Sequence, residues 1–166
     1  DNLLSVKKMT SVGIEVKFCK YKALIMKDKT REIATRPLQR IHSDVCGPID
    51  PVAWNGSRYF VSFIDDFTHF SIIYTIKRKS DVFNKFLEYE AMVSAKFGLS
   101  ISKLTVDQGR EYGSKEQLNW YKQKGIQVEE TIAYTPQQNG VAERFNRTLV
   151  EKVRSMILQS NMPKYT

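Results

Sequence analysis

The chain has 166 residues, of which 42% are hydrophobic and 27% charged, so it is long enough to form a core and unlike a disordered segment. Its 26 basic and 18 acidic residues give a net charge of +8, which suits a nucleic-acid binder but also a soluble surface rich in lysine. Two cysteines and two histidines exclude a disulfide scaffold and the usual paired-ligand zinc sites, and no apolar run is long enough to span a membrane.

The first 36 residues are expected to form a small extension. They carry nine basic and four acidic residues, whereas residues 37–166 carry seventeen and fourteen. Apolar and charged residues alternate over 14–18, and a second apolar run covers 21–26, so the pattern predicts a strand–turn–strand. Arg36-Pro37 marks the expected boundary with a second domain over residues 37–166.

The second domain is predicted to begin with three strands and a helix. The strands, over 40–45, 59–65 and 70–76, have short links and indicate an antiparallel meander. Ser80 is the expected N-cap of the helix, and Gly98 its left-handed end. The apolar positions with helical spacing are Val82, Phe83, Phe86, Met92, Val93 and Phe97.

Alternating strands and helices are predicted for the remainder. A strand over 101–106, a helix over 114–124 ended by Gly125, and a strand over 126–131 precede a loop over 135–140. A long amphipathic helix follows, with its apolar face marked by Val141, Phe145, Leu149, Val153 and Ile157. This order predicts an α/β fold with a mixed sheet flanked by helices.

Three carboxylates stand out. Asp44 lies within the first strand of the second domain, Asp107 follows the strand over 101–106, and Glu143 is placed in the first turn of the last helix. A carboxylate buried in a strand is costly without a metal or a hydrogen-bond donor. Mg²⁺ prefers oxygen ligands, and paired metal ions support phosphoryl transfer. Such residues therefore suit a metal site for chemistry on phosphate esters.

Each carboxylate also has an ordinary structural explanation. Asp44 can cap the turn that leads into Cys46-Gly47-Pro48, and Asp107 can be a turn residue. Glu143 can stabilise a helix N-terminus or pair with Arg147 one turn later. Taken singly, these explanations are stronger than a catalytic one, and the case for catalysis depends on the motifs around all three residues.

Those motifs resemble the catalytic core of retroviral-type integrases, and more narrowly the integrase of copia-type LTR retrotransposons. The resemblance runs from about Arg36 to the C-terminus. It is carried by His42-Ser43-Asp44-Val45-Cys46-Gly47-Pro48, Phe63-Ile64-Asp65-Asp66-Phe67, Asp107-Gln108-Gly109-x-Glu111-Tyr112 and Thr135-Pro136-Gln137-Gln138-Asn139-Gly140-Val141-Ala142-Glu143-Arg144-x-Asn146-Arg147-Thr148.

The resemblance implies an RNase H-like fold with a five-stranded mixed sheet. It also implies that Asp44, Asp107 and Glu143 are catalytic and bind Mg²⁺, for which Mn²⁺ can substitute. The implied activity is that of a polynucleotidyl transferase, which trims the 3′ end of transposon DNA and joins the new 3′-hydroxyl to target DNA. DNA is the implied partner, a homodimer is possible and no membrane is involved. The nucleus is the implied location, after synthesis in the cytoplasm.

Further roles follow from the same resemblance. Tyr134, Asn139 and Arg147 are candidate DNA contacts, although Tyr134 packing on the core, and a Glu143–Arg147 pair, are open alternatives. Asp65, Asp66 and Glu111 are expected to be structural.

The sequence also departs from the family. Gln108 stands where the family usually has Asn, no His-His-Cys-Cys zinc domain separates residues 1–36 from the core, and the last residues stop within a family motif. We therefore expect a truncated integrase core. The alternative is a catalytically inactive or domesticated relic that only binds nucleic acid.

Overall fold

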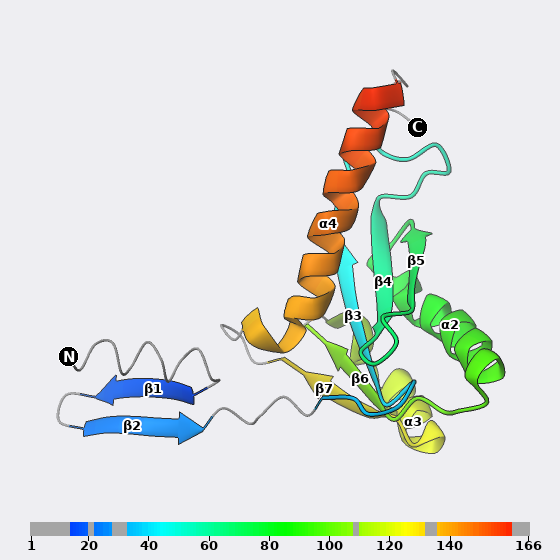
Figure 1. The fold of residues 1–166 in the computed structure, drawn as a ribbon. Helices are drawn as coiled ribbons and strands as arrows, with labels where there is room; N and C mark the ends of the chain where they lie inside the picture. The colour runs from blue at the N-terminus through cyan, green and yellow to red at the C-terminus, as the bar shows by residue number, and fades with distance from the viewer. Residues whose placement is uncertain (1–13, 20–21, 28–32, 108–109, 132–135, 161–166) are drawn as a thin grey trace. The chain divides into compact units, whose positions relative to one another are not determined.

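The computed structural model describes residues 14–19, 22–27, 33–107, 110–131 and 136–160. It divides the chain into two compact units, residues 1–33 and 34–166, so the division lies three residues before the expected boundary at Arg36. In the first unit, β1 (Ile14–Cys19) and β2 (Lys22–Lys27) form a two-stranded antiparallel sheet (Figure 1). These are the two strands that the alternating pattern predicted.

The second unit is built on the expected mixed sheet of five strands. The strands lie in the order β5-β4-β3-β6-β7. Strand β4 pairs antiparallel with β3 and β5, whereas β6 pairs parallel with β3 and β7. Their bounds are β3 (Arg40–Cys46), β4 (Tyr59–Asp65), β5 (Ser71–Ile76), β6 (Lys103–Val106) and β7 (Gln127–Glu130). The fold is α/β, as predicted.

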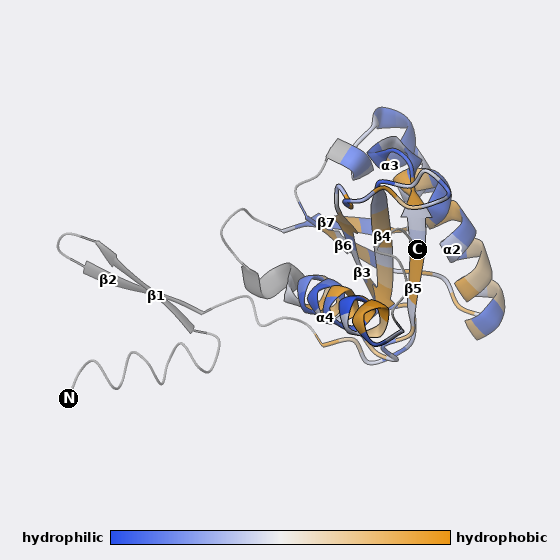
Figure 2. Cartoon of the chain, turned by 90° about the horizontal axis from the view of Figure 1, so that it is seen from above, coloured by the Kyte–Doolittle hydropathy of each residue, from blue (hydrophilic) through white to orange (hydrophobic). Residues whose placement is uncertain are grey.

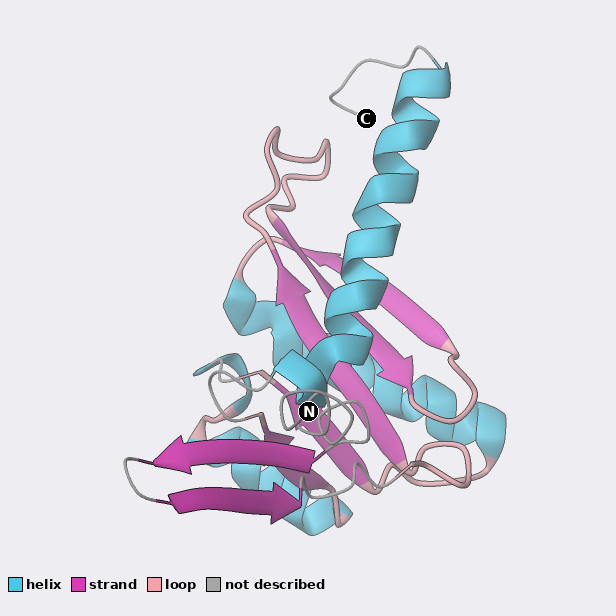
Figure 3. Cartoon of the chain, turned by 60° about the vertical axis from the view of Figure 1, so that its left-hand side comes forward, coloured by secondary structure: helices cyan, strands magenta, loops and turns pink. Residues whose placement is uncertain are grey.

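Helices cover both faces of this sheet. Helix α4 (Pro136–Ser160) crosses one face along β3 and β4, and α2 (Val82–Phe97) and α3 (Lys115–Lys124) lie on the other (Figures 1 and 3). Two single 3₁₀ turns, η1 (Lys79–Asp81) and η2 (Arg110–Tyr112), precede α2 and α3. The predicted glycine ends are confirmed, since Gly98 and Gly125 have φ of 65° and 72°.

Two predictions about helix starts are wrong. Ser80 lies inside η1 and does not cap α2, whose N-cap position is Asp81. Residues 136–140, expected in a loop, form the start of α4, so Glu143 lies about two turns into the helix rather than in its first turn. Proline is well suited to a first helical turn, and the tertiary contacts of α4 outweigh the weak propensities of the residues that follow.

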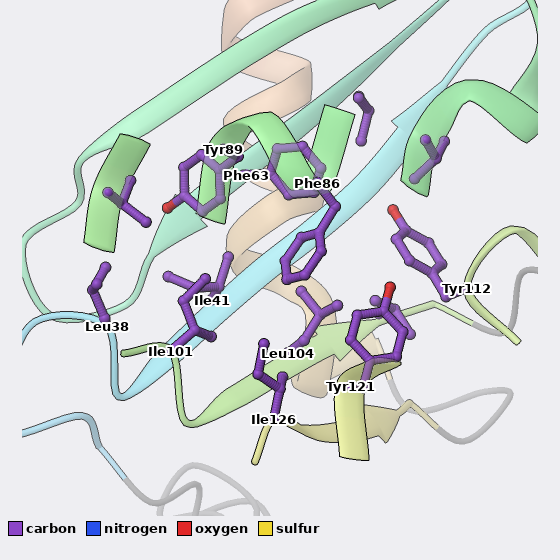
Figure 4. Close-up of a cluster of buried hydrophobic side chains, with 14 of the residues drawn as sticks. Leu38, Ile41, Phe63, Phe86, Tyr89, Ile101, Leu104, Tyr112, Tyr121 and Ile126 are labelled. Carbon is purple, nitrogen blue, oxygen red and sulfur yellow. The ribbon is translucent and has the colours of Figure 1, made fainter. Parts of the chain in front are cut away.

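The hydrophobic core lies between the sheet and helices α2 and α3 (Figure 4). Phe63 of β4 is at its centre, with its ring stacked on Tyr89 at 4.9 Å and tilted against Phe86 at 5.7 Å between ring centroids. Met92, which was expected on the apolar side of α2, is exposed, whereas Tyr89, three residues earlier, is fully buried. The fully buried side chains of the cluster include Leu38, Ile41, Val61, Val82, Val93 and Leu104.

Helix α4 contacts the sheet through a different set of residues. Ala142 and Asn146, four residues apart, are buried, whereas Val153 of the expected apolar face is exposed. The last turns of α4 carry further exposed apolar residues, and the end of the helix is coloured as hydrophobic in Figure 2. Within the described residues, no helix is both long enough and apolar enough to cross a membrane.

Two acidic residues at the end of β4 hold the segment that leads into β3. The buried carboxylate of Asp65 accepts hydrogen bonds from the backbone N–H of Leu38 at 2.8 Å and from Thr68 at 2.8 and 2.6 Å. Asp66 lies 3.1 Å from the buried His42 Nε2 and accepts from the N–H of Ala34 at 3.3 Å. The prediction that both are structural is confirmed.

Candidate active site

The sheet places Asp44 and Asp107 next to each other. Strand β3 runs parallel to β6, and Ser43 is paired with Val106. The residue after each of these is an aspartate, so both carboxylates lie at the same edge of the sheet, where β6 ends. Asp107 is exposed to solvent and Asp44 is half-buried. A ligand that reaches this edge therefore meets two carboxylates on neighbouring strands.

The surroundings of Asp44 make its carboxylate unusual. Burial raises its pKa, and the charge of Asp107 raises it further, while a hydrogen bond from Asn146 and the charge of Lys79 act in the opposite direction without cancelling the rise. The side-chain amide of Asn146 donates to Asp44 Oδ2 at 2.9 Å. A half-buried carboxylate beside a second carboxylate attracts a cation.

Glu143 lies on α4, three residues before Asn146, so the two share one side of the helix. The helix thus carries Glu143 close to the residue that contacts Asp44, and the Glu143 side chain is exposed. Among the described residues, no group of three or more His, Cys, Asp or Glu side chains is arranged to hold a metal ion. The structure therefore brings together Asp44 and Asp107, and the role of Glu143 in the same site stays a prediction.

Two further hydrogen bonds support the segments that carry the two carboxylates. Tyr112 of η2 shares a buried hydrogen bond of 2.7 Å with the hydroxyl of Ser43, the residue before Asp44. Thr131 donates to Asp107 Oδ1 at 3.4 Å. The first bond ties the end of β3 to η2, and the second ties the residue after β6 to the residue after β7.

Lys79 and Glu111 form an ion pair at the same edge. The Lys79 Nζ lies 2.8 Å from Glu111 Oε1. Burial alone favours a raised pKa for Glu111, but the hydrogen bond and charge of Lys79 leave it lowered. This pair ties η1, which follows β5, to η2, which follows Asp107. This ion pair supports the expectation that Glu111 is structural, which stays a prediction.

Comparison with known proteins identifies the family. Residues 34–136 match the family described as Integrase core domain. The chain belongs to the integrase core domain family. It is also 44% identical, over 127 residues, to the retrovirus-related Pol polyprotein from transposon TNT 1-94 of Nicotiana tabacum; the match covers 76% of this chain and 10% of the polyprotein.

The fold of this integrase core is also found among solved structures. A chain in the cryo-EM structure of the simian T-cell lymphotropic virus intasome, in complex with PP2A regulatory subunit B56 gamma, superposes with a TM-score of 0.61. It shares 22% sequence identity, and the match covers 76% of this chain and 44% of that chain. At that identity the likeness concerns the fold.

The donor set of the integrase core fits a hard divalent cation. Asp44 and Asp107 supply carboxylate oxygens, and the side-chain oxygen of Asn146 is buried with no hydrogen-bond partner among the described residues. Integrase cores usually use divalent metal ions, and Mg²⁺ and Mn²⁺ prefer such oxygen ligands. The residues present are therefore suited to the group that the family implies.

The three candidate DNA contacts are only partly described. Arg147 is exposed on α4, one residue after Asn146. Asn139 lies in the same helix, but its side chain, like Tyr134 and Gln108, is outside the described residues.

The motif around Glu143 includes Asn146, but the burial of this side chain and its bond to Asp44 were not predicted. Asn146 is 4% exposed and holds Asp44, yet an asparagine in a helix next to Arg147 is normally expected on the surface. The signal available was its spacing of four from the small Ala142. The ion pair between Lys79 and Glu111 likewise has no local signal in the sequence, because the two residues are 32 positions apart.

Proposed function

We propose that the chain is the core of a retrotransposon integrase that carries out metal-dependent 3′-end processing and strand transfer of DNA. The observation that carries this proposal is the parallel pairing of Ser43 with Val106, which puts Asp44 and Asp107 side by side. Family membership and the oxygen-rich donor set add support. Transposon ends and target DNA would be the substrates.

In this proposal Asp44, Asp107 and Glu143 hold Mg²⁺, or Mn²⁺ in its place. Bound metal ions would activate an attacking oxygen and stabilise the leaving oxygen of a phosphodiester. The residues of the chain do the positioning. Asn146 fixes the orientation of Asp44 through its amide, and Ser43 and Tyr112 keep the end of β3 in place.

DNA would lie along the exposed side of α4. Arg147 is placed to contact a phosphate, and Tyr134 and Asn139 are proposed as contacts near the start of this helix. The chain spans about a tenth of the tobacco polyprotein that it matches, so a homodimer and action in the nucleus are also proposals for this core.

The test is strand chemistry on branched DNA with Mg²⁺ or Mn²⁺. The unaltered chain is expected to cleave and join such a substrate, and Asp44→Asn, Asp107→Asn and Glu143→Gln are each expected to reduce the product to background. Glu151→Gln is the matched control, because Glu151 is exposed on α4 two turns after Glu143. Equal product from the unaltered chain and the three variants would contradict the proposal.

A second candidate function is nucleic-acid binding without turnover. It is favoured by the net charge of +8 and by the exposed basic residues of α4, namely Arg144, Arg147, Lys152 and Arg154. In that case DNA binding would fall with salt and survive Asp44→Asn, and no product would form with either metal ion. Metal-dependent product that Asp44→Asn removes excludes this candidate.

A further inference from the structure

The loop between β3 and β4, residues 47–58, presents a tryptophan to solvent. Trp54 is 85% exposed. The other tryptophan, Trp120, is half-buried and packs edge-on against Phe83 and Phe86. A large aromatic ring contributes most to the stability of a protein when it is buried. A ring as exposed as that of Trp54 is therefore more typical of a binding surface.

This loop has a fixed shape. The N–H of Ile49 donates to Arg58 O at 2.6 Å, and the N–H of Ala53 donates to Ser57 O at 3.1 Å. The side chain of Asn55 accepts from the N–H of Ser57 at 2.9 Å and donates to Thr75 of β5 at 3.2 Å. Trp54 therefore stands on a turn that is bonded to the sheet, and little order has to be gained when it binds.

Gly47 closes the base of the loop. Its φ is +134°, and a Cβ built there would lie 2.8 Å from Arg58 O and from the ring of Tyr59. A larger residue would push the two ends of the loop apart. Figures 1 and 3 show the loop projecting beyond the end of the sheet where β3 ends and β4 begins.

Basic side chains surround this loop. Arg58 precedes β4, and Lys77, Arg78 and Lys79 follow β5, so the antiparallel sheet brings all four exposed residues to the same end as the loop. A Cβ on Gly56 would lie 3.6 Å from the Lys77 side chain. The loop and residues 77–81 hold four basic residues and two acidic ones, Asp50 and Asp81, which leaves a net charge of +2.

The row of basic residues formed by Arg58 and residues 77–79 reaches the candidate active site. Its last member, Lys79, pairs with Glu111, and its positive charge also interacts with the carboxylate of Asp44. Asp44 itself lies three residues before Gly47, at the end of the strand that leads into the loop. A nucleic-acid strand bound along Arg58, Lys77 and Arg78 would therefore pass beside the candidate active site.

We propose that this surface binds a single-stranded segment of DNA, with Trp54 stacked on an unpaired base and Arg58, Lys77 and Arg78 against its phosphates. A polyanion with exposed aromatic faces matches a ring next to basic side chains. Within a duplex both faces of a base are covered by its neighbours, so the ring needs an unpaired nucleotide. The inference rests on the proposed function, because trimming one 3′ end of a duplex leaves nucleotides of the other strand unpaired.

The experiment measures binding of the full chain to labelled oligothymidine and to a blunt duplex, at low salt and without divalent cations. Trp54→Ala is expected to weaken oligothymidine binding roughly five- to hundredfold and to change duplex binding little. Trp54→Phe should keep most of the affinity. Phe67→Ala is the matched control, since Phe67 is an exposed aromatic in the turn between β4 and β5, at the opposite end of the sheet, and it should change neither affinity.

The charge part of the surface has its own readout. Lys77→Ala is expected to lower the salt dependence of oligothymidine binding by about one phosphate contact, with Lys96→Ala, on the last turn of α2, as the control. Thermal denaturation of each variant should match that of the unaltered chain, because these side chains are exposed.

The outcomes separate this inference from the proposed function. Oligothymidine binding by Trp54→Ala that equals that of the unaltered chain, or an equal loss on both probes, overturns the stacking role. Reduced oligothymidine binding by Trp54→Ala supports the surface even if no strand chemistry occurs with Mg²⁺ or Mn²⁺. Failure of the unaltered chain to bind oligothymidine overturns this inference, whereas the proposed function is decided separately by strand chemistry on branched DNA with Mg²⁺ or Mn²⁺.

Discussion

The two faces of the central sheet are covered by different chemistry. On one face, α2 and α3 bring aromatic and aliphatic side chains against Phe63, Leu104 and their neighbours. On the other, α4 crosses β3 with the small Ala142 and the polar Asn146. The first contact excludes water over a large apolar area, whereas the second orients a carboxylate. One face therefore supplies most of the stability, and the other supplies the geometry of the candidate active site.

The largest expected effect is on the aromatic face. Phe63→Ala should lower the free energy of unfolding by about 3–5 kcal/mol, because the ring is fully buried and removing it leaves a cavity. Phe67→Ala, at an exposed phenylalanine in the turn after β4, should change it by less than about 0.5 kcal/mol. Denaturant titration of both variants measures the difference. Similar losses in the two would mean that this face is not the stabilising one.

The face with α4 is expected to give a smaller loss of stability and a larger loss of function. Asn146→Ala removes the donor to Asp44 and should lower the free energy of unfolding by about 1–3 kcal/mol. Strand chemistry with Mg²⁺ should fall further than this loss of folded protein explains, because Asp44 is no longer held. Thr148→Ala, at an exposed position two residues along α4, is the control and should leave both unchanged.

An Asn146→Ala variant that folds less stably but keeps full product per folded molecule would assign Asn146 to packing alone. Measuring the folded fraction and the product in the same buffer separates the two cases. The comparison between the faces is sharpest here, because Phe63→Ala should lose product only in proportion to folded protein.

The two faces also differ in how far the sequence predicted them. Apolar strands around Phe63 and glycines at 98 and 125 are local signals, and the elements that they indicate are present. Asn146 belongs to the motif around Glu143, but its burial has no local signal, because it depends on β3, which lies about a hundred residues earlier in the chain. The helical start of α4 was also missed, because Pro136, Asn139 and Gly140 favour turns in isolation. Asp44 and Asp107 were predicted by the motifs around them, and their pairing needed the sheet register.

Tyr112 provides a finer test of the support below Asp44. Tyr112→Phe removes only the hydroxyl that bonds to Ser43 and should lower the free energy of unfolding by about 0.5–1.5 kcal/mol. Tyr121→Phe is a matched control, because the buried Tyr121 hydroxyl has no hydrogen-bond partner in the described part of the chain. Its loss should be neutral or stabilising. Thermal denaturation distinguishes the two, and an equal shift in both would deny the Ser43 bond a stabilising role.

The smallest effect is expected at the Lys79–Glu111 pair. A double-mutant cycle with Lys79→Met and Glu111→Gln should give a coupling of about 0.2–1 kcal/mol at neutral pH, since the Lys79 side chain is half exposed and water screens the pair. The i,i+3 pair Lys85–Glu88 on α2 serves as the comparison, because its two charges join no separate segments.

The coupling at Lys79–Glu111 should depend on pH with a definite sign. The pKa of Glu111 is lowered from its ordinary value of 4.5, so the pair stabilises the fold above that value, and the contribution disappears as the pH falls through the lowered pKa. The pKa of Lys79 is raised from 10.5, chiefly by its hydrogen bond to Glu111, so at the alkaline end the contribution persists to the raised value. Repeating the cycle at acid pH checks this. A coupling that stays constant below the lowered pKa of Glu111 would show that the two side chains interact by packing, and that no ion pair ties the segment after Asp107 to the start of α2.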